Sequence, residues 1–376
     1  MSATPAVLAH ALLVAVVAIT ANASDLSAPA DLHDGLPVAN PATAGLDVAS
    51  LIGLNDAVAK GVYPKTTSVL VVRGGKLVYE AYFGDGSSDL LNDTRSATKS
   101  ITSLAIGAAI ADGAISSQHA KAFSYLGDLR PYQNDTPEKE SITIEELLTM
   151  SSALDCNDDD NKSPGNEDNM HPQPNWSRWA VDLPTMQAYA RDSSGFGPWR
   201  YCTTGAFLLG QILQRAVRMP VDQYVEKRLL RPLGITQRQW PYSPSGETMT
   251  GGGLRLRSRD LAKIAAMMED GGRWRGEQPQ GLDRFSALGS QEGVSGRELR
   301  ISVLAAGLRH SVRSAVGLVY GRERWQYRRA ARRPSHRDRG DTHELQRARH
   351  APPDYGPAGA LCASCAAVHV VRLSAG

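Results

Sequence analysis

Apolar positions in the first third of the chain follow two different periods. Residues 46–59 repeat apolar side chains at helical spacing. Two runs rich in β-branched and aromatic residues follow at 67–72 and 77–83, and a Gly-Gly turn joins them, which predicts a β-hairpin. Apolar residues return at helical spacing over 101–110, and Asp-Gly at 112–113 marks the end of that helix. The predicted order is therefore helix, hairpin, helix.

Beyond this point the pattern is mostly helical with polar loops, and we interpret 113–246 as a helical insertion. Within it, Thr143 is followed three residues later by Glu146, which predicts a capping box at a helix start. After the insertion, Ser258 is the expected N-cap of a helix over 259–270.

The N-terminal segment reads as a targeting sequence. The apolar run at 11–19 is too short to anchor in a bilayer, and Ala-Asn-Ala at 21–23 fits a signal-peptidase site. We predict a signal peptide at 1–23, with a buried N-terminal helix as the alternative, and a leader loop at 24–45. The mature protein is then expected to be exported, either periplasmic or secreted, with no membrane span after signal removal.

Length and composition fit one large domain, with 376 residues and 42% hydrophobic content. The formal net charge of +2 hides an asymmetry between two regions. Residues 277–376 contain sixteen Arg, no Lys and nine acidic residues, whereas residues 1–276 have a formal net charge of −5. Residues 321–350 have almost no aliphatic side chains, so we expect no strands from them and an unpaired edge in the sheet.

Three interpretations of the arginine-rich tail at 277–376 compete. We favour a reading-frame shift near Gly276, because GC-rich DNA read out of frame yields Arg, Ala, Pro, Ser and Gly. A disordered extension is the second interpretation. A basic arm for nucleic acid is the third, but the segment lacks helical or strand period, and we expect no nucleic-acid partner.

Ser96 and Lys99 lie at the start of the helix that follows the hairpin. Their three-residue separation places both side chains on one face. A serine hydroxyl becomes a good nucleophile when a neighbouring base removes its proton, and a neutral lysine one turn away can do so. Backbone N–H groups at the helix start would favour an oxyanion beside Ser96. Taken alone, the pair is equally consistent with a capping serine and a solvated lysine.

A Ser-Lys pair benefits from a third group that relays the proton to the leaving atom, and a tyrosine phenol can do this. Two tyrosines compete for the role. Tyr132 begins a Tyr-x-Asn match but sits in a proline-flanked loop. Tyr201 lacks the Asn, yet it precedes an apolar helix at 206–213 much as Ser96 precedes its own. We prefer Tyr201, and the alternative for it is a half-buried tyrosine with its hydroxyl in water.

Cysteines and acidic residues suggest further contacts. An exported protein could pair Cys156 with Cys202, although spacing does not establish the pair. Cys362 and Cys365 have C-x-x-C spacing but lie in the atypical tail, so we assign no redox or metal site to them. Oxygen-rich residues at 155–168 could bind calcium, but their spacing differs from that of an EF-hand. We therefore expect a solvated surface loop and no metal.

Several separate blocks together resemble the β-lactamase-related serine hydrolases. This superfamily contains class C β-lactamases, penicillin-binding DD-peptidases, certain esterases and the 6-aminohexanoate-dimer hydrolases. The last group is the most similar, through Leu-Asp-Cys-Asn-Asp-Asp at 154–159 and Tyr-Cys at 201–202. The resemblance extends over 46–276, in the right order, and implies an α/β (α+β) fold of β-lactamase/transpeptidase type, with a mainly antiparallel sheet flanked by helices. The blocks that carry it are 96–103, 147–152, 201–210 and 251–263.

The resemblance also implies roles for individual residues. Ser96 would be the acyl-forming nucleophile, Lys99 its activating partner and Tyr201 the proton relay, with the base left open between Lys99 and Tyr201. Thr203 stands where many relatives have Asn, so it would bind substrate through a hydroxyl. The implied reaction is hydrolysis of a small amide, ester or β-lactam through an acyl-serine, with no metal or organic cofactor.

One element of the family pattern is missing. Relatives carry a later K-T-G or H-x-G box, or a Gly-rich equivalent, on a strand that forms one wall of the site, and we find none after Gly253. Two alternatives to an active enzyme follow. The chain could be a catalytically defective pseudo-enzyme or fragment, or a cell-wall-associated binding protein that uses the helical insertion. The sequence indicates neither the substrate nor the oligomeric state.

Overall fold

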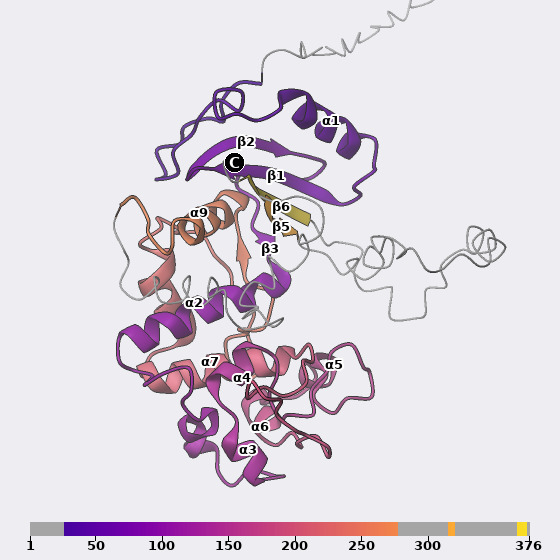
Figure 1. Ribbon diagram of the computed structural model, residues 1–376, viewed down its shortest axis with the longest axis vertical. Helices are drawn as coiled ribbons and strands as arrows, with labels where there is room; N and C mark the ends of the chain where they lie inside the picture. Colours follow the sequence, from indigo (N-terminus) through magenta and orange to yellow (C-terminus); the bar gives the residue numbers. More distant parts are fainter. Residues whose placement is uncertain (1–25, 277–314, 320–366, 374–376) are drawn as a thin grey trace, which may run out of the picture.

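The computed structural model describes residues 26–276, 315–319 and 367–373 (Figure 1). Strands β1 (Thr66–Arg73) and β2 (Lys76–Tyr82) form the predicted antiparallel hairpin. Because side chains alternate along a strand, Val69 and Val71 join a small apolar cluster with Leu51 of helix α1 (Val48–Ala59), whereas Leu70 and Val72 face the main core. The hairpin is thus covered on both faces.

The main sheet has the order β2-β1-β6-β5. Strand β6 (Ala367–Leu373) runs parallel to β1 and antiparallel to β5 (Ala315–Val319), so two of the three pairings are antiparallel. The expected mainly antiparallel sheet is confirmed.

The expectation that the sheet lacks its terminal strands is wrong, because β6 pairs with β1 and β5 pairs with β6. The β6 sequence Ala-Val-His-Val-Val-Arg-Leu is rich in β-branched residues, which suit a pleated strand. The high arginine content of the tail as a whole concealed this short run. Residues 321–350, Cys362 and Cys365 lie outside the described residues, and the reading-frame hypothesis stays a prediction.

Helix α2 (Thr98–Ala111) lies between the sheet and the helical region (Figure 1). A short 3₁₀ turn, η1 (Arg95–Ala97), precedes it, and the small pair β3 (Asn92–Asp93) and β4 (Arg255–Leu256) fixes the approach to that turn. Every residue from Thr98 to Ala109 is buried. The predicted stop is confirmed, since Asp112 is the C-cap and Gly113 follows with φ of 73°.

Helix α7 (Thr203–Val217) is the centre of the helical insertion, and its first eleven residues, Thr203–Leu213, are buried. It contacts α2, α4, α6, α8 and η2. The capping box at Thr143 and Glu146 is confirmed. The other elements of the insertion are η2 (Ala122–Leu129), α3 (Pro137–Ser141), α4 (Ile144–Leu148), α5 (Glu167–Met170), α6 (Trp176–Val181) and α8 (Val221–Val225), which continues as a π-helical turn over Glu226–Leu230.

Helix α9 (Ser258–Glu269) returns the chain to the sheet and packs on β1. The prediction that Ser258 caps this helix is wrong, because the N-cap is Arg257 and Ser258 is fully buried. Its hydroxyl lies 2.8 Å from Ser68 Oγ and accepts from Asn92 Nδ2 at 3.2 Å. The serine therefore joins α9 to β1 and β3 by polar contacts that its sequence position does not indicate.

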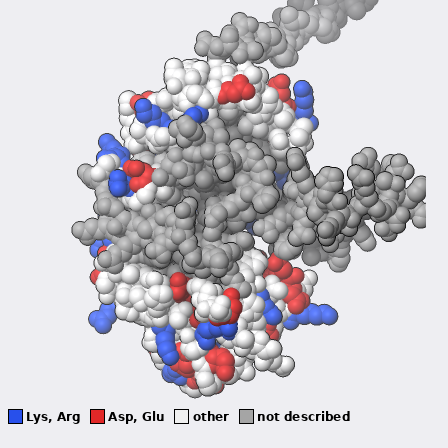
Figure 2. Space-filling model, in the orientation of Figure 1, with Lys and Arg blue, Asp and Glu red and all other residues white. Residues whose placement is uncertain are grey.

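The surface carries both signs of charge. Figure 2 shows Lys, Arg, Asp and Glu side chains interspersed over the described part of one face. Within residues 26–276 and the two tail strands, no helix has the length and apolar character needed to cross a bilayer. The predicted signal peptide at 1–23 lies outside this range. The leader forms a loop from residue 26 to 45, with one isolated bridge from Val38 to Leu77.

Candidate active site

Ser96 and Lys99 meet as their spacing predicts. Ser96 lies in the 3₁₀ turn and Lys99 in the first turn of α2, and Lys99 Nζ donates a hydrogen bond to Ser96 Oγ at 3.2 Å. Lys99 is only 6% exposed, and the N-cap of α2 is Ala97. The alternative of a capping serine with a solvated lysine is therefore wrong.

The side-chain nitrogen of Lys99 links three separate segments. Besides Ser96 Oγ, it donates to the carbonyl oxygen of Gly251 and lies 5.0 Å from the centroid of the Tyr201 ring. A carbonyl oxygen and a hydroxyl oxygen accept hydrogen bonds from a lysine nitrogen, and an aromatic face attracts its N–H groups. Lys99 thereby orients the hydroxyl of Ser96 and the ring of Tyr201 around one nitrogen.

The Gly251 segment needs its glycine because it passes close to α7. A Cβ at Gly251 would lie 2.6 Å from Thr203 Cγ2 and 2.9 Å from Thr203 O, closer than real Cβ contacts. The segment is tied to α2 as well, since Thr102 Oγ1 donates to Thr250 O at 2.8 Å. The glycine-rich run therefore fits tightly between the two central helices.

Tyr201, rather than Tyr132, is the tyrosine at this site. Tyr132 is 7% exposed, packs edge-on against Phe123, and donates its hydroxyl to Leu126 O at 2.8 Å. It is a core residue of the helical insertion. Tyr201 is partly buried, and the exposed Trp199 flanks it with ring centroids 6.3 Å apart.

Thr203 is the first residue of α7 and is 1% exposed. Its N–H donates to Asp158 Oδ2 at 2.7 Å. Its hydroxyl is buried and makes no hydrogen bond of ordinary geometry within the described ranges, although it still interacts with the Asp158 carboxyl group. The expectation that this hydroxyl binds substrate stays a prediction.

The acidic loop at 155–168 is not simply a solvated surface loop. Asp159 and Asp160 are exposed, but Asp158 is partly buried. Burial raises the pKa of its carboxyl group, although the Thr203 hydroxyl and two backbone N–H groups oppose the shift. Cys156 in the same loop forms a disulfide with Cys202. Asp158 is the residue that sequence reasoning missed, and no local signal distinguishes it from its acidic neighbours.

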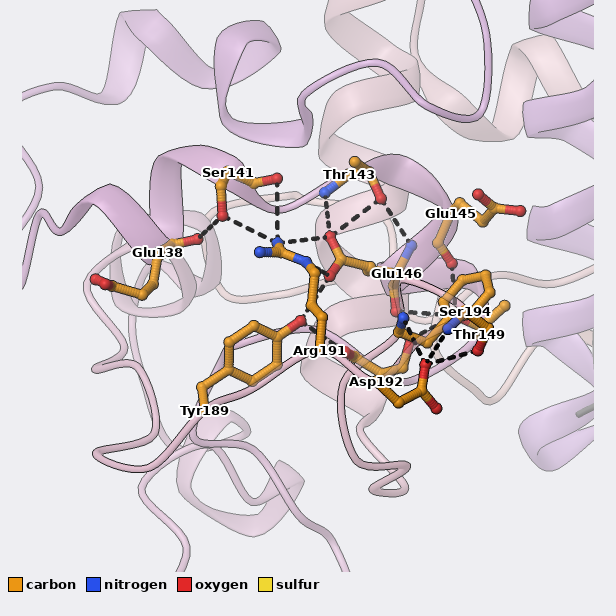
Figure 3. Close-up of polar contacts among 12 residues, drawn as sticks. Glu138, Ser141, Thr143, Glu145, Glu146, Thr149, Tyr189, Arg191, Asp192 and Ser194 are labelled. Carbon is orange, nitrogen blue, oxygen red and sulfur yellow. Dashed lines mark hydrogen bonds and ion pairs between the residues drawn. The ribbon is translucent and has the colours of Figure 1, made fainter.

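A second polar cluster anchors the chain that leads to Tyr201 (Figure 3). Glu146 of α4 is 2% exposed and accepts from Tyr189 Oη at 2.6 Å, from Arg191 Nε at 2.8 Å and from the Thr143 N–H at 2.9 Å. Burial raises the pKa of Glu146, but these hydrogen bonds outweigh it and hold the pKa below its usual value. The sequence indicated only the contact with Thr143.

Metal ligands do not gather at the site. The three described ranges contain no group of three or more His, Cys, Asp or Glu side chains placed to hold a metal ion. Ser96 Oγ contacts Lys99 Nζ, which also contacts the Gly251 carbonyl oxygen and the face of the Tyr201 ring.

A buried helix that carries a Ser-x-x-Lys pair between a mainly antiparallel sheet and a helical region defines the β-lactamase-type class of fold. The chain belongs to the Beta-lactamase family, whose model matches residues 55–363. It is 25% identical over 213 residues to a 6-aminohexanoate-dimer hydrolase from Paenarthrobacter ureafaciens, a match that covers 55% of this chain and 53% of that protein. The chain thus spans about half the length of this relative.

Solved structures agree on the fold. A Bacillus anthracis protein described as a 6-aminohexanoate-dimer hydrolase aligns with a TM-score of 0.51 and 17% identity, covering 63% of this chain and 62% of its own. A Bacteroides dorei protein described as a beta-lactamase aligns with a TM-score of 0.51 and 18% identity, covering 70% and 76%. The resemblance inferred from the sequence blocks is confirmed at the level of family and fold.

Proposed function

We propose that this protein is a serine hydrolase that cleaves an amide or ester bond through an acyl-Ser96 intermediate. The observation that carries the proposal is the 3.2 Å contact between Lys99 Nζ and Ser96 Oγ, with Lys99 buried and the Tyr201 ring beside it. A lysine in this setting is removed from bulk water and is aimed at the one atom whose proton must leave.

The reaction would proceed in two stages. Ser96 Oγ attacks the substrate carbonyl carbon while the Lys99–Tyr201 pair takes its proton. The same pair returns a proton to the leaving nitrogen or oxygen as the scissile bond breaks. Water then attacks the acyl ester and frees Ser96. Helix α2 begins two residues after Ser96, and the dipole at its N-terminal end favours the negative charge that develops on the carbonyl oxygen.

The choice of substrate rests on chemistry and on relatives. The P. ureafaciens relative is named for hydrolysis of the 6-aminohexanoate dimer, so a short linear amide is the first substrate to test. Esters and β-lactams share the acyl-serine step. We also propose that the protein is exported, since the Cys156–Cys202 disulfide supports an oxidising compartment.

The test is covalent labelling of the purified chain with a fluorophosphonate, read by intact-mass spectrometry. Ser96 Oγ would displace fluoride and leave one phosphonyl adduct. We expect one adduct on the wild type and on Ser88→Ala, whose serine is exposed, and none on Ser96→Ala. A folded wild type without any adduct would support the pseudo-enzyme alternative and contradict the proposal.

A further inference from the structure

The acidic loop at 155–168 contacts every residue of the segment 200–204, which contains Tyr201. These contacts are of different kinds: an ion pair, backbone and side-chain hydrogen bonds, and a disulfide. They are Asp155 Oδ1 to Arg200 Nη1 at 3.3 Å, the Asp158 N–H to Tyr201 O at 2.7 Å, Cys156 to Cys202 through sulfur, the Thr203 N–H to Asp158 Oδ2 at 2.7 Å, and Thr204 Oγ1 to Gly165 O at 2.9 Å.

Asp158 contributes two of these contacts, one on each side of Cys202. Its N–H holds the carbonyl of Tyr201, and its Oδ2 holds the N–H of Thr203. Its other oxygen, Oδ1, accepts from the N–H of Glu167 at 2.9 Å. The carboxylate is therefore fixed at both oxygens, and charge-assisted bonds of this kind are the stronger ones.

Tyr201 needs such support because it lies outside the helix that follows. Helix α7 begins at Thr203, and Cys202 is its N-cap, with Cys202 Sγ accepting from the Gly205 N–H at 3.1 Å. Intrahelical hydrogen bonds thus begin after Tyr201 and cannot fix its backbone. The loop contacts remain to set the direction in which the Tyr201 ring points toward Lys99 Nζ.

The loop can approach closely because residue 165 is glycine. A Cβ at Gly165 would lie 2.7 Å from Cys156 Cβ and 2.9 Å from Asp155 O. Any larger residue would push the two ends of the loop apart. The position of Asp158 is therefore determined by packing of the loop on itself as well as by its own bonds.

We propose that Asp158 is a positioning residue for Tyr201, holding the backbone on both sides of Cys202 so that the phenol meets Lys99 and Ser96. This inference rests on the proposed function of Ser96, Lys99 and Tyr201. The disulfide acts in parallel with Asp158 as a covalent tie between the same two segments.

The test is a double-mutant cycle on the full chain with a p-nitrophenyl ester, measuring the rate of acyl-enzyme formation. We expect Asp158→Ala to lower the rate about tenfold in the wild-type background and less than about twofold in a Tyr201→Phe background. Asp158→Asn keeps one acceptor oxygen, so its acylation rate in the wild-type background should lie between those of wild type and Asp158→Ala. Asp159→Ala, at the exposed neighbour, is the matched control and should leave the rate unchanged.

An equal loss in both backgrounds would overturn the proposal, since Asp158 would then act on the fold in general. A second measurement is independent of catalysis: amide hydrogen exchange over residues 201–205. Asp158→Ala should speed exchange there, whereas Asp159→Ala should not. Unchanged protection in Asp158→Ala would overturn the positioning role even if the wild type is never acylated, whereas faster exchange without acylation would contradict only the proposed function.

Discussion

The two halves of the candidate site are built in different ways. Ser96 and Lys99 lie three residues apart, in the 3₁₀ turn and in the first turn of helix α2 that follows it. This helix is buried from Thr98 to Ala109. Tyr201 precedes its helix and is held by a loop more than forty residues earlier in the chain. The first half depends on local geometry and apolar packing, and the second on polar long-range contacts.

The two halves of the site can therefore be damaged separately by substitution. Substitutions in the acidic loop remove hydrogen bonds near Tyr201 but leave the packing of α2 untouched. Substitutions in α2 disturb the main core, where lost apolar contacts typically cost about 2–5 kcal/mol. Three sets of substitutions test whether the two halves differ in this way.

The largest effect is expected at Lys99. Lys99→Met keeps most of the volume but removes the nitrogen that contacts Ser96 Oγ, so the acylation rate should fall by at least about 10³-fold. Burst kinetics with a p-nitrophenyl ester would measure it. Lys121→Met, at an exposed lysine, is the control and should show no change. An acylation rate within tenfold of wild type would show that Lys99 is not the activating partner.

A smaller effect on the acylation rate is expected at Tyr201, which long-range contacts hold in place. Tyr201→Phe removes only the phenol oxygen and should lower the acylation rate by about 10²-fold. Tyr132→Phe is the matched control, because it removes the same atom from a tyrosine bonded to Leu126 O.

We expect Tyr201→Phe to affect the acylation rate and Tyr132→Phe to affect stability. Tyr132→Phe should leave the acylation rate unchanged and lower the free energy of unfolding by about 1 kcal/mol. Denaturant titration would provide that value. If Tyr132→Phe reduced acylation and Tyr201→Phe did not, the assignment of the proton relay to Tyr201 would be wrong.

The smallest effect on catalysis is expected at Glu146, which anchors the approach to Tyr201 (Figure 3). Its pKa is held below the usual value in the folded state. The carboxylate therefore contributes stability above the unfolded pKa of about 4.3, and this contribution is lost as pH falls through the lower folded pKa. Glu146→Gln should be less stable than wild type at pH 7, by about 2 kcal/mol.

Thermal unfolding between about pH 7 and pH 3 would check this, because the stability of wild type should fall toward acid more steeply than that of Glu146→Gln. Glu138→Gln, at an exposed glutamate, is the control and should follow the wild-type profile. Parallel acid profiles for wild type and Glu146→Gln would contradict the role given to this carboxylate. At neutral pH the acylation rate of folded Glu146→Gln should change less than about threefold, because the Asp158 contacts remain.

Much of the local structure could be predicted. The hairpin, the helix after Ser96 with its Asp112-Gly113 end, and the capping box at Thr143 each depend on residues a few positions apart. The preference for Tyr201 over Tyr132 rested on the apolar helix that follows it. The structure places the Tyr201 ring beside Lys99, and the role of proton relay stays a prediction.

Other features could not be predicted. Serine is a common residue at helix N-caps, but Ser258 instead makes hydrogen bonds with Ser68 and Asn92 across the core. The short β-branched run at 367–373 pairs with β1, far away in sequence, and its signal was lost in the arginine-rich composition around it. In both cases the deciding partner is remote, so no window of neighbouring residues contains it.

The sequence by itself therefore determined the family, the order of the main elements and the Ser96–Lys99 pair, because helical periodicity and a three-residue spacing are local properties. Three other features are visible only in the folded chain: the Tyr201 ring lies beside Lys99, Cys156 bonds to Cys202, and Asp158 rather than Asp159 contacts the Thr203 N–H. These outcomes depend on burial and on contacts between distant segments. Identical acidic residues acquire different roles only once the chain has brought one of them, and not its neighbour, against a helix start.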